Sequence, residues 1–176
     1  MSETSPILLL PDAGPLITLA YADALDLLFK PEWQVNIVDM VQHEVTRNQT
    51  PTNQKIPHWI VENKVQVLRT KTLEHFQQTQ ASGATPPRKA NLGEFAIQEA
   101  MNNFALMSPP PTAVFLFEDH KIARASFLLP DNCRKVSTRS FLQFLEQKQW
   151  IRSAAEIERK AILNGRLFSQ LRFPPE

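Results

Sequence analysis

The sequence predicts a three-layer α/β/α fold with a mostly parallel central sheet. Short apolar runs alternate along the chain with segments of helical periodicity, which is the pattern of strands joined by crossover helices. The 176 residues suit one domain, and 43% of them are hydrophobic, enough to form a substantial core. Charged residues make up 21%, as in folded globular proteins, so disorder is not expected as the main state.

The amino-terminal part of the chain predicts two strand–helix units. A buried strand is expected over residues 7–10, followed by a helix that opens at Pro15 and carries an apolar stripe as far as Leu28. A second strand is expected over residues 33–38. Asp39 and Gln42 then form the pattern of a capping box, which predicts a short helix carrying Glu44.

The rest of the chain continues the alternation. The expected elements are a short helix near Trp59, a strand over 65–68, a polar helix over 70–80, a break over 81–89, a helix over 91–104, a strand over 113–117, a helix from Asp119 to 128, a strand near Val136 and helical structure over 140–167. We expect a main domain over residues 1–150. Residues 151–176 are expected to be its helical extension, because Ala154, Ile157 and Ala161 have amphipathic spacing.

Acidic residues stand at two strand ends. Asp12 follows the first predicted strand and Asp119 follows the most apolar one. In parallel α/β sheets, ligands bind outside the carboxyl ends of the strands. Neighbouring carboxylates repel one another unless a cation lies between them, and Mg²⁺ and Mn²⁺ prefer oxygen ligands. With Glu44 and Glu94, these residues predict a divalent-metal site that could activate water against a phosphodiester.

Each of these acids also has a purely structural interpretation. Asp12 could hydrogen-bond the turn before the first helix, and Asp119 could cap the helix that follows it. Glu94 lies three residues after Asn91, which is a capping arrangement, and Glu44 could be a solvated helix residue. Only their joint placement on the predicted sheet favours the metal site.

Other kinds of site find little support in the sequence. Cys133, the single cysteine, cannot form an internal disulfide, and a free cysteine is more often inert than a catalytic nucleophile. The four histidines have no paired zinc-ligand spacing, and the four glycines cannot form a phosphate-binding loop. No signal-peptide pattern and no apolar run of membrane-spanning length occur, so we expect a cytoplasmic protein without a membrane partner.

The charge balance does not by itself indicate a nucleic-acid partner. The formal net charge is +1, from 19 basic and 18 acidic side chains, so a basic surface would have to be local. Four basic residues flank the predicted site in sequence and are candidate phosphate contacts: Arg88, Lys89, Lys121 and Arg124. Ordinary solvated charges remain the alternative interpretation.

Five passages of the sequence resemble the PIN-domain family of metal-dependent ribonucleases, and within it the VapC-type toxins with a Leu-Gly-Glu third motif. The passages are LLLPDAGPLITLAYADALDLLF, IVDMVQHEVTRN, NLGEFAIQEA, VFLFEDHKIARAS and VSTRSFLQFL. Together they span residues from about 7 to 150. Two positions depart from the family pattern, because Gly14 and Phe117 stand where many relatives have Ser or Thr.

The resemblance implies specific roles for the four acids. Asp12, Glu94 and Asp119 would be ligands of Mg²⁺ or Mn²⁺, and Glu44 would be a further ligand or would orient the attacking water. Glu118 is the alternate acid at the end of the fourth strand. The implied activity is hydrolysis of single-stranded RNA, and the implied partners are RNA, a small antitoxin protein and a second copy of the chain.

Two other functions stay open from the sequence. The missing hydroxyls at Gly14 and Phe117, with the near-neutral charge, also suit a PIN-like binding module without catalysis. A nuclease or phosphatase acting on DNA or on small phosphate esters is the third hypothesis.

Overall fold

The computed structural model describes residues 5–47, 51–84, 92–118 and 129–167. Its centre is a parallel five-stranded sheet with strand order β3-β2-β1-β4-β5. The strands are β1 (Ile7–Pro11), β2 (Gln34–Val38), β3 (Gln66–Leu68), β4 (Thr112–Phe117) and β5 (Cys133–Ser137). The predicted α/β/α fold class is confirmed.

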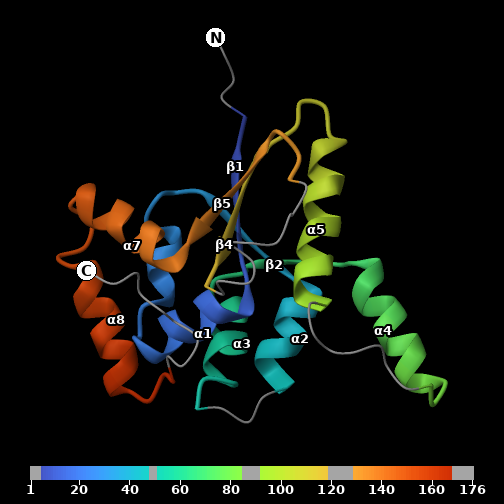
Figure 1. Ribbon diagram of the computed structural model, residues 1–176, viewed down its shortest axis with the longest axis horizontal. Helices are drawn as coiled ribbons and strands as arrows, with labels where there is room; N and C mark the ends of the chain where they lie inside the picture. The colour runs from blue at the N-terminus through green and yellow to red at the C-terminus, as the bar shows by residue number, and fades with distance from the viewer. Residues whose placement is uncertain (1–4, 48–50, 85–91, 119–128, 168–176) are drawn as a thin grey trace.

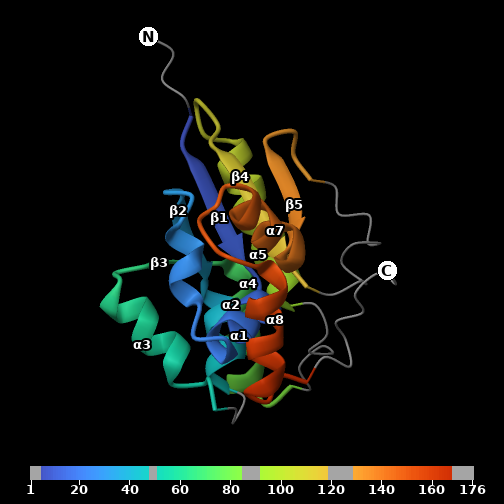
Figure 2. The ribbon, with the colours of Figure 1, turned by 90° about the vertical axis from the view of Figure 1, so that its left-hand side faces the viewer.

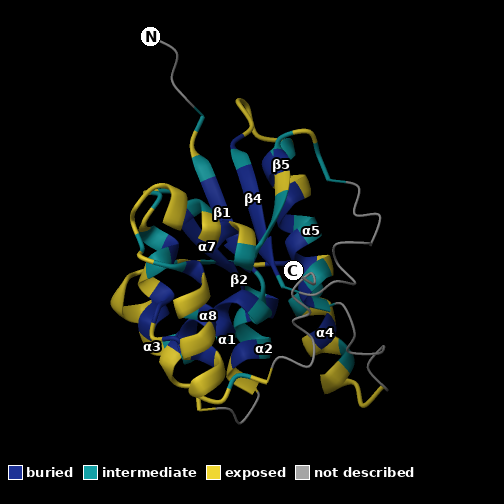
Figure 3. Ribbon diagram, turned by 60° about the vertical axis from the view of Figure 1, so that its left-hand side comes forward, coloured by how far each residue is buried: buried dark blue, intermediate teal, exposed yellow. Residues whose placement is uncertain are grey.

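Two neighbouring inner strands of the sheet, β1 and β4, are the most apolar segments of the chain. Leu9 of β1 pairs with Val35 on one side and with Val114 of β4 on the other. Because helices cover both faces of the sheet, such strands need apolar side chains in both directions rather than an alternating pattern. Figure 3 shows β1 and β4 almost entirely buried, while exposed residues gather on the outer sides of the helices.

The helices form the two outer layers. Figures 1 and 2 show α5 on one side of the sheet and α7 on the other. The helical elements are α1 (Ala13–Tyr21), the 3₁₀ helix η1 (Leu25–Phe29), α2 (Asp39–Arg47), α3 (Lys55–Glu62), α4 (Lys71–Ala81), α5 (Leu92–Ala105), α7 (Thr138–Gln147) and α8 (Ala154–Leu163). No helix within the described ranges is long and apolar enough to cross a bilayer.

Three local predictions need correction. The first helix does not continue to Leu28, because α1 ends at Tyr21 and Asp23 has a positive φ of 52° before η1 begins. The capping box is wrong as well: the Asp39 carboxylate accepts hydrogen bonds from Met40 and Thr70. The predicted helical stretch 140–167 is two helices, since residues 148–153 separate α7 from α8.

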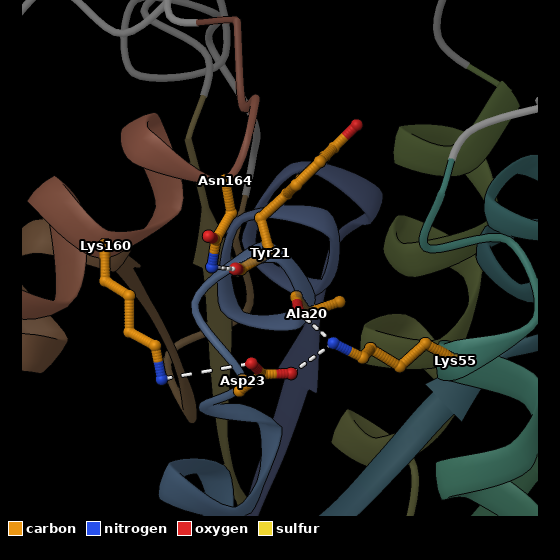
Figure 4. Close-up of polar contacts among 6 residues, drawn as sticks. All are labelled: Ala20, Tyr21, Asp23, Lys55, Lys160 and Asn164. Carbon is orange, nitrogen blue, oxygen red and sulfur yellow. Dashed lines mark hydrogen bonds and ion pairs between the residues drawn. The ribbon is translucent and has the colours of Figure 1, made fainter.

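The carboxyl-terminal end of α1 is held by residues from two other helices (Figure 4). Lys55 of α3 donates to the Ala20 carbonyl oxygen (3.2 Å) and pairs with the Asp23 carboxylate. From the other side, Asn164, which follows α8, donates to the Tyr21 carbonyl oxygen (2.6 Å). Donors at this end satisfy carbonyls that have no partner within the helix. These contacts fix both α1 and the segment after α8 relative to the sheet.

Candidate active site at the carboxyl ends of the strands

Asp12 lies at the point where the strand order reverses. It follows β1, immediately precedes α1, and its backbone N–H donates to the Leu116 carbonyl oxygen of β4 (2.9 Å). The chain continues from β1 toward β2 on one side and reaches β4 on the other, so a crevice is expected at the carboxyl ends of β1 and β4. The sequence prediction that placed Asp12 at this edge is confirmed.

The surroundings of Asp12 disfavour its charge. Removal of its carboxyl group from water raises its pKa from 3.8 to about 7, and the carboxylates of Glu44, Glu94 and Glu118 act in the same direction. The Ala13 backbone N–H opposes the shift. Asp12 keeps part of its surface exposed, so this is not a fully dry carboxyl. Acids from α2, α5 and the end of β4 therefore act together on the residue that follows β1.

Glu44 is held by the first turn of α5. The Gly93 backbone N–H donates to Glu44 Oε1 (3.1 Å), and a Cβ built on Gly93 would lie 2.8 Å from Glu44 Oε2. Only glycine lets the carboxylate approach the helix start this closely. The N–H groups of a helix start have no partners within the helix and attract anions. This contact gives the Leu-Gly-Glu passage a physical meaning: its glycine admits Glu44 and its glutamate adds a neighbouring carboxylate.

Burial and Glu94 both act on Glu44. Burial is the main cause that raises the Glu44 pKa, and the Glu94 carboxylate raises it further. The Gly93 N–H and the Arg47 side chain act in the opposite direction. Because Glu94 acts on both Asp12 and Glu44, the three acids predicted from sequence do converge. Asp119, the fourth, lies outside the described residues, as do Arg88, Lys89, Lys121 and Arg124.

Glu118 is a further acid of this region. Its side chain is 7% exposed, and Oε2 accepts hydrogen bonds from Thr18 Oγ1 (2.9 Å) and Arg166 Nη2 (3.1 Å). Oε1 is buried and has no hydrogen-bond partner in the part of the chain that the structure describes. The sequence indicated Glu118 only as an alternate to Asp119, and it gave no sign of Thr18 or Arg166. Thr18 lies 100 positions from Glu118 in the sequence and Arg166 lies 48 positions from it, so no local sequence pattern could predict these contacts.

Gly14 is explained by the same acid. A Cβ on Gly14 would lie 3.0 Å from both Cβ and Oε2 of Glu118. The hydroxyl side chain that many PIN domains carry at this position would therefore meet the Glu118 side chain. At the other departure from the pattern, Phe117 is a buried core residue at the end of β4. Glu118 occupies the space that a hydroxyl at position 14 would need.

Replacing Gly14 by Ser is expected to destabilise the protein by about 1–3 kcal/mol, because the crowded Glu118 Cβ is close to the backbone and cannot easily move away. The free energy of unfolding in urea measures this. Asn103→Ala, an exposed change on α5, is the control and should leave the midpoint unchanged. A Gly14→Ser protein as stable as the wild type would contradict the crowding.

The donor set suits a hard divalent ion in its chemistry. Asp12 and the three acids that act on it offer carboxylate oxygens, and a buried oxygen of Glu118 has no partner among the described residues. Within residues 5–47, 51–84, 92–118 and 129–167, no three acidic, histidine or cysteine side chains are already arranged to hold an ion. An ion bound here would therefore need ligands beyond the described carboxylates, such as water or Asp119.

Sequence comparison does not place the chain in a family. No protein-family model and no curated protein sequence matches it. Among solved structures, the chain is similar to the PIN domain of T. brucei RRP44, with a TM-score of 0.51 and 15% sequence identity. The similarity covers 84% of this chain and 83% of that one. At this identity the likeness concerns the fold, and it shows that the chain has a PIN-like α/β/α fold.

Proposed function

We propose that this protein is a divalent-metal-dependent endoribonuclease that hydrolyses phosphodiesters of single-stranded RNA. The observation that carries the proposal is the set of acids at Asp12. Carboxylates from four separate elements of the fold act on one another at the reversal point of the sheet, where their mutual repulsion lowers stability. A site that retains such repulsion is typical of a cation-binding or catalytic centre.

The proposed roles follow the positions of the acids. Asp12, Glu94 and Asp119 would hold Mg²⁺ or Mn²⁺. Glu44, fixed through Oε1 by the Gly93 N–H, would be a further ligand or would orient the attacking water. When bound, the ion supplies neutralisation of the charge that develops on the phosphodiester and a lower pKa for water. The protein's own contribution would be the carboxylate oxygens that a strand end and the helices α2 and α5 bring to this edge of the sheet.

Metal binding and RNA cleavage, measured on the same metal-free preparation, test this function. Isothermal titration with Mn²⁺ should detect binding, and single-stranded RNA should be cleaved only when the ion is present. A folded protein that binds no Mn²⁺ at millimolar concentration would instead support a binding module without catalysis. That second function is favoured by Gly14 and Phe117, which stand where many PIN domains have a hydroxyl side chain, and by the near-neutral net charge. Hydrolysis assays with DNA and with small phosphate esters as substrates test the third hypothesis, a nuclease or phosphatase that acts on those substrates.

The toxin role is a finer part of the proposal and has its own test. The sequence resemblance to VapC-type toxins supports a cytoplasmic toxin over residues 1–150 with a helical extension over 151–176, a small antitoxin partner and a homodimer. Induced expression in bacteria should then arrest growth, and the Asp12→Asn protein at the same level should not. Equal growth with both proteins would remove the toxin role and leave the ribonuclease proposal to its own assay.

A further inference from the structure

Arg166 reaches the candidate site from the segment after α8. The helix ends in a turn in which the Gly165 N–H donates to the Ile162 carbonyl oxygen and the Arg166 N–H to that of Ala161. Gly165 has a φ of +107°, so this reversal needs glycine. The Asn164 side chain is bonded to α1 just before it (Figure 4). The backbone that carries Arg166 is therefore held on both sides of the turn.

The Arg166 guanidinium is anchored along one edge. Nε donates to Thr18 Oγ1 (3.0 Å) and Nη2 donates to Glu118 Oε2 (3.1 Å). Thr18 in turn donates to the same oxygen of Glu118 (2.9 Å), so Arg166, Thr18 and Glu118 are each hydrogen-bonded to the other two. A guanidinium has five N–H donors. Within the described residues, Nη1 makes no hydrogen bond, and 21% of the side chain is exposed.

The anchored guanidinium lies beside the acids of the site. Glu118, its ion-pair partner, acts directly on Asp12. Two further charged groups act on this neighbourhood through space: Glu158 of α8 interacts with Glu118, and Arg139 interacts with Glu158. On the other side, Arg47 interacts with Glu44. Arg166 is hydrogen-bonded to Glu118, an acid that acts on Asp12.

A phosphodiester that approaches this site meets several carboxylates. A cationic donor beside them would offset the repulsion, and the planar guanidinium suits phosphate oxygens because its donors match their geometry. Because Nη1 makes no hydrogen bond within the described residues, its donors remain for a phosphate oxygen. We propose that Arg166 contacts a phosphate of the RNA strand next to the carboxylates, with Thr18 and Glu118 holding its orientation. This inference rests on the proposed ribonuclease function.

Salt-dependent RNA binding tests the contact without relying on cleavage. A fluorescent twelve-nucleotide RNA is titrated in EDTA at several salt concentrations between 50 and 200 mM. Each phosphate contact contributes about 0.7 to the slope of log affinity against log salt for a single strand. Arg166→Met should bind more weakly and lose about one such contact from the slope. The control is Arg159→Met, a change of an exposed arginine on α8, and it should keep the slope of the wild type.

Two further variants separate a phosphate contact from a tether. Arg166→Lys keeps the positive charge and serves as the test if the Arg166→Met protein melts below the assay temperature. It should retain the salt slope of the wild type but bind RNA more weakly, since lysine cannot reproduce the paired N–H donors of a guanidinium. Glu118→Gln breaks the same ion pair but keeps the arginine, so its slope should not fall. If the wild type binds RNA and Arg166→Met has the same salt slope, this inference is overturned while the proposed function stands. Wild-type protein without RNA binding overturns the proposed function as well.

Discussion

Asp12→Asn is expected to abolish Mn²⁺-dependent cleavage of RNA, with a fall in kcat/KM of about a hundredfold or more. An amide lacks the negative charge that a metal ligand supplies, and a hundredfold loss corresponds to about 2.7 kcal/mol of the several kcal/mol that a catalytic ion contributes. Unlike a change that unfolds the chain, this one should make the metal-free protein more stable at pH 8. The reason is the raised pKa of Asp12.

The sign of that stability effect follows from proton binding. Because the Asp12 pKa is about 7 in the folded protein and 3.8 ordinarily, the folded state holds its proton more tightly than the unfolded chain. The wild-type carboxyl therefore lowers stability progressively as the pH rises from about 4 through 7, and its full cost is present above that range. The difference corresponds to about 4 kcal/mol at most. Partial exposure of Asp12 makes the effect smaller.

Melting temperatures in EDTA at pH 4.5 and pH 8 measure this difference. Asp12→Asn should melt several degrees above the wild type at pH 8 and close to it at pH 4.5. Mn²⁺ should raise the melting temperature of the wild type, because a ligand that binds only the folded state stabilises it, and should not raise that of the variant. Glu62→Gln, an exposed acid on α3, is the matched control. Full cleavage activity in Asp12→Asn would refute the assignment.

Gly93→Ala is expected to separate activity from stability. Alanine favours a helix over glycine by about 1 kcal/mol, so the substitution should not weaken α5. Its Cβ, however, would stand 2.8 Å from Glu44 Oε2. The carboxylate is the far end of a flexible side chain, so it can turn away at little cost to the fold and would lose its bond to the Gly93 N–H. We expect cleavage to fall about tenfold or more with no loss of stability.

The measurement pairs urea unfolding with cleavage kinetics. Asn103→Ala, an exposed change to alanine on the same helix, should leave cleavage unaffected. Glu44→Gln should reproduce the activity loss of Gly93→Ala, because both remove a charged oxygen from its place. If Gly93→Ala cleaves RNA as fast as the wild type, the position of Glu44 against α5 has no part in the reaction.

The fold could be predicted from sequence because its signals are local or periodic. The apolar runs of β1 and β4 need burial on both faces, and the alternation of strands and helices limits the topology to a few parallel arrangements. The same reasoning placed Asp12 at the edge of the sheet formed by the carboxyl ends of the strands. Glu44 and Glu94 lie near Asp12 because the helices that carry them, α2 and α5, begin at that edge.

The remaining features depend on contacts that no local pattern records. The break after Tyr21 was missed because the apolar residues of η1 continue the helical spacing of α1. Gly93 gave a local signal, a glycine in the first turn of a helix directly before an acid, but its partner Glu44 lies 49 positions away. The Arg166 contact with Thr18 spans 148 positions and becomes visible only in three dimensions.

The close approach of Gly14 to Glu118 has an evolutionary consequence. Positions 14 and 118 compete for the same space and cannot change independently. A methyl or hydroxymethyl group gained at position 14 needs a shorter side chain at position 118 to avoid Oε2, and a small shift of the strand end to avoid the Cβ. Homologues should therefore fall into two groups, one with glycine followed about a hundred residues later by a long acid, the other with a small alcohol paired with a shorter residue. This chain, with Gly14 and Glu118, has the first combination.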